Sequence, residues 1–346
     1  MDDVDHRVVI VTAQPGQAVA TTSFPVGHNV VSATPSLDGT HLFILSSGDQ
    51  PQLTASDESP ALTVIDASTF SPSETRFTMA EPLPTLALDP LGHWAVAYTG
   101  PGASASTFVS NPNGFEFFDL TSAPGPNNPV DRTIRSFGGT PQRLTFTPTL
   151  LLPAFGSTLD NPAGTPTRLL LIESTIDLTL LDMDHAFDQP APRKEVTVRL
   201  TSGTTSQALN PAGLVVDDGG PSNPDDARIA LRTATDSNVF IIELGPSAAG
   251  APNGFMPSIN LTDVGGIPSA IGFVHTTSKV GSDDCGLRVA ALVPSSSSAV
   301  LIDPSQGASA SVALASPYTN MSFVTNFTCG SAGSTSGGVS TEAALL

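Results

Sequence analysis

The residues whose chemistry stands out first are carboxylates around a short polar segment. Four aspartates bracket a stretch rich in Gly, Pro, Ser and Asn: Asp217, Asp218, Asp225 and Asp226. Carboxylates, Asn side chains and backbone carbonyls are the oxygen ligands that Ca²⁺ prefers, so this segment predicts a weak calcium site. The Asp-x-Asp-x-Asp-Gly loop is absent, and Asp is also a common turn former. Solvated loop carboxylates are therefore the alternative interpretation.

Histidine and motif spacing point to no catalytic centre. The six histidines show neither the HxH nor the HxxxH spacing of metal ligands; they are His6, His28, His41, His93, His185 and His275. The sequence contains no GxSxG elbow, no P-loop and no GxGxxG, and neither cysteine has an evident histidine partner. No catalytic residue and no cofactor other than calcium is predicted.

The charge balance restricts the possible partners. The 346 residues carry a net charge of −19, with only 13 Lys and Arg. Binding to nucleic acid or to an anionic membrane surface needs a basic footprint, so neither is predicted. No apolar run approaches the ~20 residues of a membrane helix. Met1-Asp2-Asp3 is interpreted as the start left after removal of a signal peptide, a cytosolic start being the alternative.

The elements that must position these residues are short strands in a repeat. Apolar or alternating runs bounded by Gly, Pro, Asn and Asp predict strands throughout the chain. An apolar run ending in an acid recurs about every 60 residues, at Asp66, Asp119, Asp182, Glu243 and Asp303. Two strand-like runs precede each acid and one follows it, which gives the four antiparallel strands of a propeller blade. We interpret these acids as turn-stabilising acceptors of backbone N–H groups. In the same repeat, His41 and His93 are placed at equivalent positions.

The two ends of the chain supply one more blade. Residues 7–11 and 18–22 read as third and fourth strands, and residues 321–325 and 341–346 as first and second strands. A blade shared between the termini closes a ring and removes its open edges. The sequence therefore predicts an all-β fold, a single β-propeller domain over residues 1–346. Six blades are preferred and seven are possible. The Gly/Ser-rich residues 331–340 are interpreted as a loop in the closing blade, a linker tail being the alternative.

Two of the repeats carry a recognisable motif. Pro35-Ser36-Leu37-Asp38-Gly39 is followed by Val64-Ile65-Asp66-Ala67-Ser68-Thr69, and a second copy runs through residues 86–92 and 117–121. This pattern resembles the YVTN/WD40-like bacterial β-propeller repeats. The tetrad that names the family is replaced by residues 43–46 and 97–100. The resemblance implies the fold but hardly any activity, because propellers include enzymes, binding proteins and scaffolds.

The repeat assignment places the two cysteines near each other. Cys285 begins the second strand of the fifth blade, and Cys329 ends the first strand of the sixth. These positions lie at the same face of neighbouring blades, so a Cys285–Cys329 disulfide is predicted. It would stabilise the fold by roughly 4 kcal/mol in the chain-entropy model. Two unpaired buried thiols are the alternative.

Long polar loops are where function is expected. Residues 47–60 and 100–114 lie at one predicted face, and residues 153–167 lie with the acidic loops at the other. Enzymatic propellers generally place His, Glu, Asp or Arg at the channel mouth, but residues 81–84, 138–141 and 265–268 are poor in them. The prediction is a non-enzymatic extracytoplasmic binding or scaffold protein (periplasmic, cell-surface or secreted) that engages a protein or polysaccharide. The alternatives are a hydrolase or lactonase acting at the channel and a structural module of a larger surface protein.

Overall fold

The protein is described from a computed structural model. The described residues are 6–13, 15–16, 18–69, 71–101, 109, 111–152, 165–187, 195–200, 210–217, 227–244, 258–275, 287–304 and 307–321.

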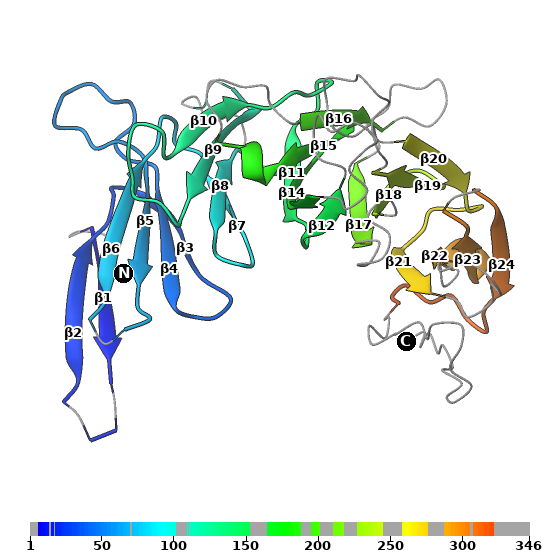
Figure 1. Cartoon of the computed structure of the whole chain (residues 1–346), viewed down its shortest axis with the longest axis horizontal. Coiled ribbons are helices and arrows are strands. Elements are labelled where there is room, and N and C mark those ends of the chain that lie inside the picture. Colours follow the sequence, from blue (N-terminus) through cyan, green and yellow to red (C-terminus); the bar gives the residue numbers. More distant parts are fainter. Residues whose placement is uncertain are drawn as a thin grey trace. The chain divides into compact units, whose positions relative to one another are not determined.

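The described chain forms five four-stranded antiparallel sheets, each with its strands side by side in chain order (Figure 1). We call them blades 1 to 5. Blade 1 contains β3 (Val30–Pro35), β4 (His41–Ser46), β5 (Ala61–Asp66) and β6 (Ser73–Thr78). Blade 2 contains β7 (Thr85–Leu88), β8 (Trp94–Tyr98), β9 (Gly114–Asp119) and β10 (Val130–Thr133). Blade 3 contains β11 (Pro141–Phe146), β14 (Leu169–Ser174), β15 (Asp177–Asp182) and β16 (Glu195–Arg199).

The remaining two sheets have the same up-and-down order. Blade 4 contains β17 (Pro211–Asp217), β18 (Arg228–Thr233), β19 (Asn238–Glu243) and β20 (Ser258–Asp263). Blade 5 contains β21 (Ala270–His275), β22 (Leu287–Val293), β23 (Ser298–Ile302) and β24 (Ser309–Ala313). Among the described residues, two single-turn 3₁₀ segments, η1 (Met183–His185) and η3 (Pro294–Ser296), follow strands of blades 3 and 5. An antiparallel four-stranded meander is the form of a propeller blade, so the all-β, blade-repeat prediction is confirmed.

The chain divides into two compact units. The first contains Met1–Phe146, Leu170–Ser174 and Leu181–Arg193, and the second contains Thr147–Leu169, Thr175–Leu180 and Lys194–Leu346. Blades 1 and 2 therefore belong to the first unit and blades 4 and 5 to the second. The boundary runs through blade 3. A single domain over residues 1–346 stays a prediction.

The predicted repeat acids mark the ends of the third strands. Asp66, Asp119, Asp182 and Glu243 are the last residues of their strands, whereas Asp303 follows the end of β23 by one residue. The fourth strand of blade 2 differs from its prediction over residues 132–137, because it covers Val130–Thr133 instead. Val130 pairs with Phe117 and is buried, so burial of Val130 fixes the earlier register.

Blade 3 contains a hairpin where the sequence predicted only a loop. β12 (Leu150–Leu152) pairs with β13 (Thr165–Thr167) as a separate two-stranded sheet between the first two strands of the blade. The predicted loop, residues 153–167, therefore begins just after one strand and ends within another. The apolar run Leu150–Leu152 gains a partner in this way, which satisfies its backbone groups.

The N-terminal strand pair is confirmed, but its proposed completion lies outside the described residues. β1 (Arg7–Thr12) and β2 (Ala20–Pro25) pair antiparallel and, in the part of the chain that the structure describes, only with each other. Residues 322–346, which include the predicted C-terminal strands and residues 331–340, are not described. Met321 is described and lies outside any strand. The shared closing blade and the count of six therefore stay predictions.

Each central blade strand is buried on both faces. In blade 1, Ile44 and Ile65 pack with Val8 and Phe24 of the β1–β2 pair. On the other face, side chains of blade 1 pack with blade 2, in a cluster that includes Phe43, Leu45, Leu62, Phe77 and Phe118. In the second unit, blades 4 and 5 share a cluster that includes Val239, Ile241, Val289 and Ile302. Within the described ranges, no helix is long and apolar enough to cross a membrane.

Candidate functional site

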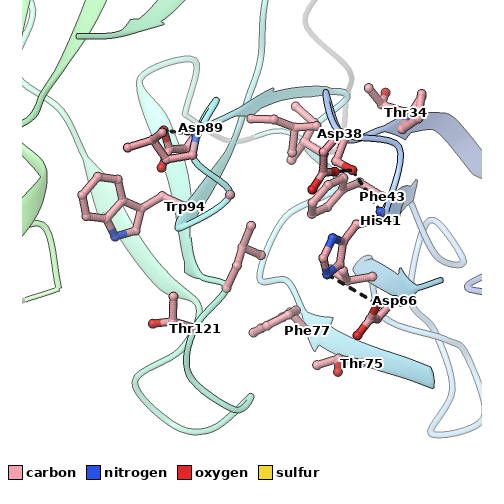
Figure 2. Close-up of a pocket in the computed structure, with 18 of the residues that line it drawn as sticks. Thr34, Asp38, His41, Phe43, Asp66, Thr75, Phe77, Asp89, Trp94 and Thr121 are labelled. Atoms are coloured by element: carbon pink, nitrogen blue, oxygen red, sulfur yellow. Dashed lines mark hydrogen bonds and ion pairs between the residues drawn. The ribbon is translucent and has the colours of Figure 1, made fainter. Parts of the chain in front are cut away.

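A cavity of the first unit lies between blades 1 and 2 (Figure 2). Its volume is about 820 Å³, within the usual range for a ligand pocket. We call it the interblade pocket. Blade 1 contributes side chains of β3 to β6 and the turn before β4, and blade 2 contributes β7, the turn before β8 and the segment after β9.

The strand register of blade 1 makes the wall of the pocket apolar at depth and polar at the mouth. Three rows of directly paired residues cross the sheet on the face toward blade 2. The deepest row is Leu45, Leu62 and Phe77, the middle row is Phe43, Val64 and Thr75, and the outermost row is His41, Asp66 and Ser73. Since side chains alternate between the two faces of a strand, residues two apart along each strand produce this gradient.

Blade 2 supplies an apolar opposite wall. Leu86 and Leu88 of β7 and Leu120 after β9 are partly buried against the same core cluster as Phe43 and Phe77. Trp94 lies at the edge of the pocket but packs against the cluster on the other side of blade 2. In Figure 2 its ring points away from Phe43 and Phe77. The pocket floor is therefore formed by Leu, Val and Phe side chains.

Two equivalent turns form the lips of the pocket. In blade 1 the Gly39 N–H donates to the Ser36 carbonyl at 3.0 Å, and in blade 2 the Gly92 N–H donates to the Asp89 carbonyl at 2.9 Å. Gly39 and Gly92 have φ of 71° and 74°, a region that favours glycine. Each turn exposes a leucine: Leu37 is 87% exposed and Leu91 is 61% exposed.

These turns correct one predicted equivalence. Ser36 donates its N–H to the His41 carbonyl, whereas Asp89 donates its N–H to the Trp94 carbonyl. His41 is therefore equivalent to Trp94, and the prediction that pairs His41 with His93 is wrong by one residue. The matched backbone hydrogen bonds make Gly39 equivalent to Gly92. His41 is two residues after Gly39, whereas His93 is one residue after Gly92, and this offset explains the error. Of the two histidines, only His41 lines the pocket.

Asp38 stays ionised at the mouth because its turn hydrogen-bonds the carboxylate. Its Oδ1 accepts from Ser36 Oγ at 2.5 Å, from the Thr40 N–H at 3.0 Å and from Thr40 Oγ1 at 2.8 Å. These bonds lower the pKa of Asp38 to about 2, and the bond from Ser36 has the largest effect. The second turn acid, Asp89, accepts from the N–H groups of Leu91 and His93 at 3.1 Å each.

The prediction that the strand-end acids stabilise turns is confirmed for three of the five. A carboxylate oxygen accepts the N–H two residues further on in three blades: Asp66 from Ser68 at 2.8 Å, Asp119 from Thr121 at 2.9 Å, and Asp182 from Asp184 at 2.9 Å. Hydrogen bonds from Ser68 lower the pKa of Asp66. Only Asp66 of the three lines the interblade pocket, with its side chain 40% exposed.

The pocket mouth is consequently acidic. Among the described residues that line the pocket are three aspartates, Asp38, Asp66 and the buried Asp89, and one histidine, His41, but no Lys, Arg, Asn or Gln. His41 Nε2 lies 3.9 Å from Asp66 Oδ1. An apolar floor beneath fixed negative charge can bind a ligand that is apolar at one end and positively charged beside it.

A second polar cluster lies at residues 47–60, the loop in which function was expected. His28 Nδ1 lies 3.0 Å from both carboxylate oxygens of Asp49, and the His28 N–H donates to Glu58 Oε2 at 2.8 Å. Arg76 contacts Glu58 Oε1 at 2.6 Å, and the Glu58 N–H donates to Asp49 at 2.8 Å. The pKa of Asp49 is lowered mainly by the hydrogen bond from the Glu58 N–H and next by the hydrogen bond to His28. Sequence reasoning missed the cluster because its members are far apart in the chain. Its groups satisfy one another and fasten the loop to blade 1.

Glu116 is a buried carboxylate of blade 2. It lies within β9, is 2% exposed, and accepts the N–H groups of Ala80 and, at 3.3 Å, Glu81. Burial raises its pKa to about 7, against the lowering effect of these bonds. The charges of Asp131 and Glu81 add to the increase. Glu116 thereby ties the connection between blades 1 and 2 to the centre of blade 2.

The predicted calcium and cysteine residues fall mostly outside the described part of the chain. Asp217 is the last residue of β17 and pairs across the sheet with Arg228. Asp218, Asp225, Asp226, Cys285 and Cys329 lie outside the described residues, so the calcium site and the disulfide stay predictions. Across the residues that are described, no group of three or more His, Cys, Asp or Glu side chains is arranged to hold a metal ion.

These sheets define an all-β protein of propeller-type blades with a pocket between two of them. No protein-family model matches the sequence, and no curated protein matches it; the YVTN family is therefore not confirmed. Solved structures similar to this chain include a functionally unknown protein from Desulfotomaculum acetoxidans DSM 771, with 13% identity, a TM-score of 0.36, and coverage of 92% of this chain and 80% of that chain.

Two further solved structures have the same level of similarity. The Cps50 (Swd1) β-propeller domain of Myceliophteria thermophila has 12% identity and a TM-score of 0.32, with 85% of this chain and 76% of that chain covered. A "putative 6-phosphogluconolactonase" from Bacteroides fragilis NCTC 9343 has 12% identity and a TM-score of 0.30, with 92% of this chain and 98% of that chain covered. At these scores the similarities carry no argument about function.

Proposed function

We propose that the protein is a non-enzymatic propeller that binds a protein or polysaccharide in its interblade pocket, outside the cytoplasm. The observation that supports this most is the pocket itself, with an apolar floor and a mouth of fixed carboxylates. The pKa values of Asp38 and Asp66 are both lowered by turn hydrogen bonds. A general acid or base works best with a pKa near the operating pH, so these carboxylates suit binding rather than proton transfer.

We further propose that the ring closes through a six-bladed arrangement in which the C-terminal segment completes the sheet of β1 and β2. The β1–β2 pair has no third strand among the described residues. Apolar side chains are exposed on it and directly before β2: Val9, Val11 and Val19. Open strand edges and exposed valines favour a covering partner. In this arrangement Cys285 and Cys329 form the disulfide, and Asp217, Asp218, Asp225 and Asp226 take calcium weakly.

The binding proposal is tested by filling the pocket. Thr75 is exposed on β6 and lines the pocket, whereas Thr78 is exposed on the same strand but faces the other way. Trp is well tolerated in strands, so Thr75→Trp fills the cavity and Thr78→Trp is the matched control. Binding is measured on arrays of oligosaccharides and of peptides.

The proposal requires that Thr75→Trp weakens binding of the array ligands by about tenfold or more, since it occupies the volume the ligand needs. The control, Thr78→Trp, should bind as the unmodified protein does. Equal binding by all three proteins would show that the ligand lies elsewhere and would refute the proposal.

A further inference from the structure

We infer that the interblade pocket takes a segment of a protein partner in which an apolar side chain stands next to a lysine or arginine. The inference rests on the proposed function, because it names which of two ligand classes, protein or polysaccharide, the same pocket accepts.

The depth of the pocket fits an apolar anchor. Val64 from blade 1 and Leu86, Leu88 and Leu120 from blade 2 are only partly buried at its floor. A Leu- or Phe-sized side chain that enters removes this remaining apolar surface, and its own, from water. Such burial contributes roughly 25 cal/mol per Å² of apolar area, and interfaces are commonly dominated by one anchor of this kind.

The mouth of the pocket fits a cation beside that anchor. Figure 2 shows Asp38, His41 and Asp66 together along the blade 1 side. The Asp66 side chain is 40% exposed, and Asp38 remains charged even in mild acid because its pKa is lowered to about 2. The chain as a whole carries a net charge of −19. An ammonium or guanidinium group therefore meets complementary charge, both at long range and through a charge-assisted hydrogen bond.

The surroundings of the pocket favour a peptide over a sugar chain. The exposed Leu37 and Leu91 extend the apolar surface beyond the mouth, so a ligand longer than the pocket gains contact there. Phe43 and Phe77 are buried and the Trp94 ring is turned away, so no aromatic platform is presented for a sugar ring. The described lining contains no Asn, Gln, Lys or Arg, which would serve as donors to sugar hydroxyls.

The test uses two probe sets and the full chain. One set consists of labelled peptides in a Gly/Ser background that pair Leu or Phe with Lys or Arg, together with the same peptides carrying Glu instead. The other set is an oligosaccharide panel. Peptides with the basic pair should bind, and those with Glu should bind at least about tenfold more weakly because like charges meet at the mouth.

Matched variants locate the binding. The double variant Leu37→Ser/Leu91→Ser should lose about tenfold in peptide affinity, whereas Leu53→Ser, a leucine 80% exposed outside the pocket, should lose nothing. Asp66→Asn should cost about threefold. Asp263→Asn is its control, because Asp263 is an exposed strand-end acid of blade 4 that also accepts the N–H two residues further on and does not line the pocket. Thermal unfolding confirms that each variant is folded.

Each outcome decides between the two ligand classes. Peptide binding with this pattern of losses supports the inference. Oligosaccharide binding that is lost in Thr75→Trp and in the double leucine variant, without peptide binding, overturns the inference and leaves the proposed function standing. Binding of neither set, or binding unaffected by any pocket variant, overturns both.

Discussion

Glu116 makes the stability of the first unit depend on pH in a predictable direction. Its folded pKa of about 7 lies above the ordinary value of 4.5 because burial disfavours the charged form. A raised acid pKa means that the stabilising protonated form is fully present below about pH 4.5 and is lost as the pH rises through about 7. At 1.36 kcal/mol per pKa unit, the difference between the folded and ordinary pKa values corresponds to about 3 kcal/mol.

The variant Glu116→Gln isolates this contribution. Glutamine keeps the shape of the side chain and a carbonyl oxygen for the Ala80 N–H, but it does not ionise. We expect the free energy of unfolding of Glu116→Gln, relative to that of the unmodified protein, to rise by about 3 kcal/mol between about pH 4.5 and pH 9. Urea unfolding at a series of pH values measures both proteins.

A comparison variant separates Glu116 from the other acids. Glu74 also has a pKa raised by burial, but Arg76 and Arg7 partly offset it and the side chain is only partly buried. Glu74→Gln should therefore show a smaller effect of the same sign. A stability difference between Glu116→Gln and the unmodified protein that stays flat across the pH range would refute the reasoning, because Glu116 would then ionise as easily in the folded state as in the unfolded one.

Two further substitutions and one thiol measurement have expected outcomes. Arg143→Ala should lower the free energy of unfolding, measured in urea, by about 3 kcal/mol. Glu173 is 1% exposed and is bonded by Arg143 at 2.6 and 2.8 Å, so the substitution leaves a buried carboxylate without its cation. An effect below about 0.5 kcal/mol would contradict this reason. Asn128→Ala should lower the melting temperature and reduce the free energy of unfolding by about 2 kcal/mol. The reason is that the Asn128 side chain bonds backbone groups of Asp119, Ser122 and Ala123. An unchanged melting temperature would contradict this. Mass spectrometry of the native protein should find no free thiol if Cys285 and Cys329 are paired, and two free thiols would exclude the disulfide.

The blade repeat was predictable because its strand and turn signals depend on residues that are close together in the chain. Asp66 and Asp119 each follow an apolar run and accept a backbone N–H two residues later, a contact that depends on neighbouring residues alone. Strand ends that depend on partners were less predictable. β10 begins at Val130 because that side chain is buried opposite Phe117, and the cross-strand register that buries it is not a property of residues 130–137 by themselves.

The interblade pocket could not be predicted in the same way. The sequence analysis singled out both His41 and Asp66, but it interpreted them as positions of the repeat and did not predict that they line a pocket. Their neighbours in space are set by the register that aligns His41 with Asp66 and Phe43 with Val64. The opposite wall, Leu86 and Leu88, comes from another blade. Whether the gap between two blades is filled or left open depends on side-chain volumes across the interface.

Local sequence is enough to predict that this chain is all-β, that it repeats in four-stranded units, and that Asp66, Asp119 and Asp182 stabilise turns. Periodicity of two, turn residues and side chain–backbone bonds act over a few residues, so they can be read along the chain. The tertiary structure alone decided that Asp38, His41 and Asp66 form an acidic mouth over a floor of Val64, Leu86 and Leu88. It also decided that Glu116 is buried. Burial and the meeting of distant side chains are properties of packed sheets, because they arise only when one blade covers another.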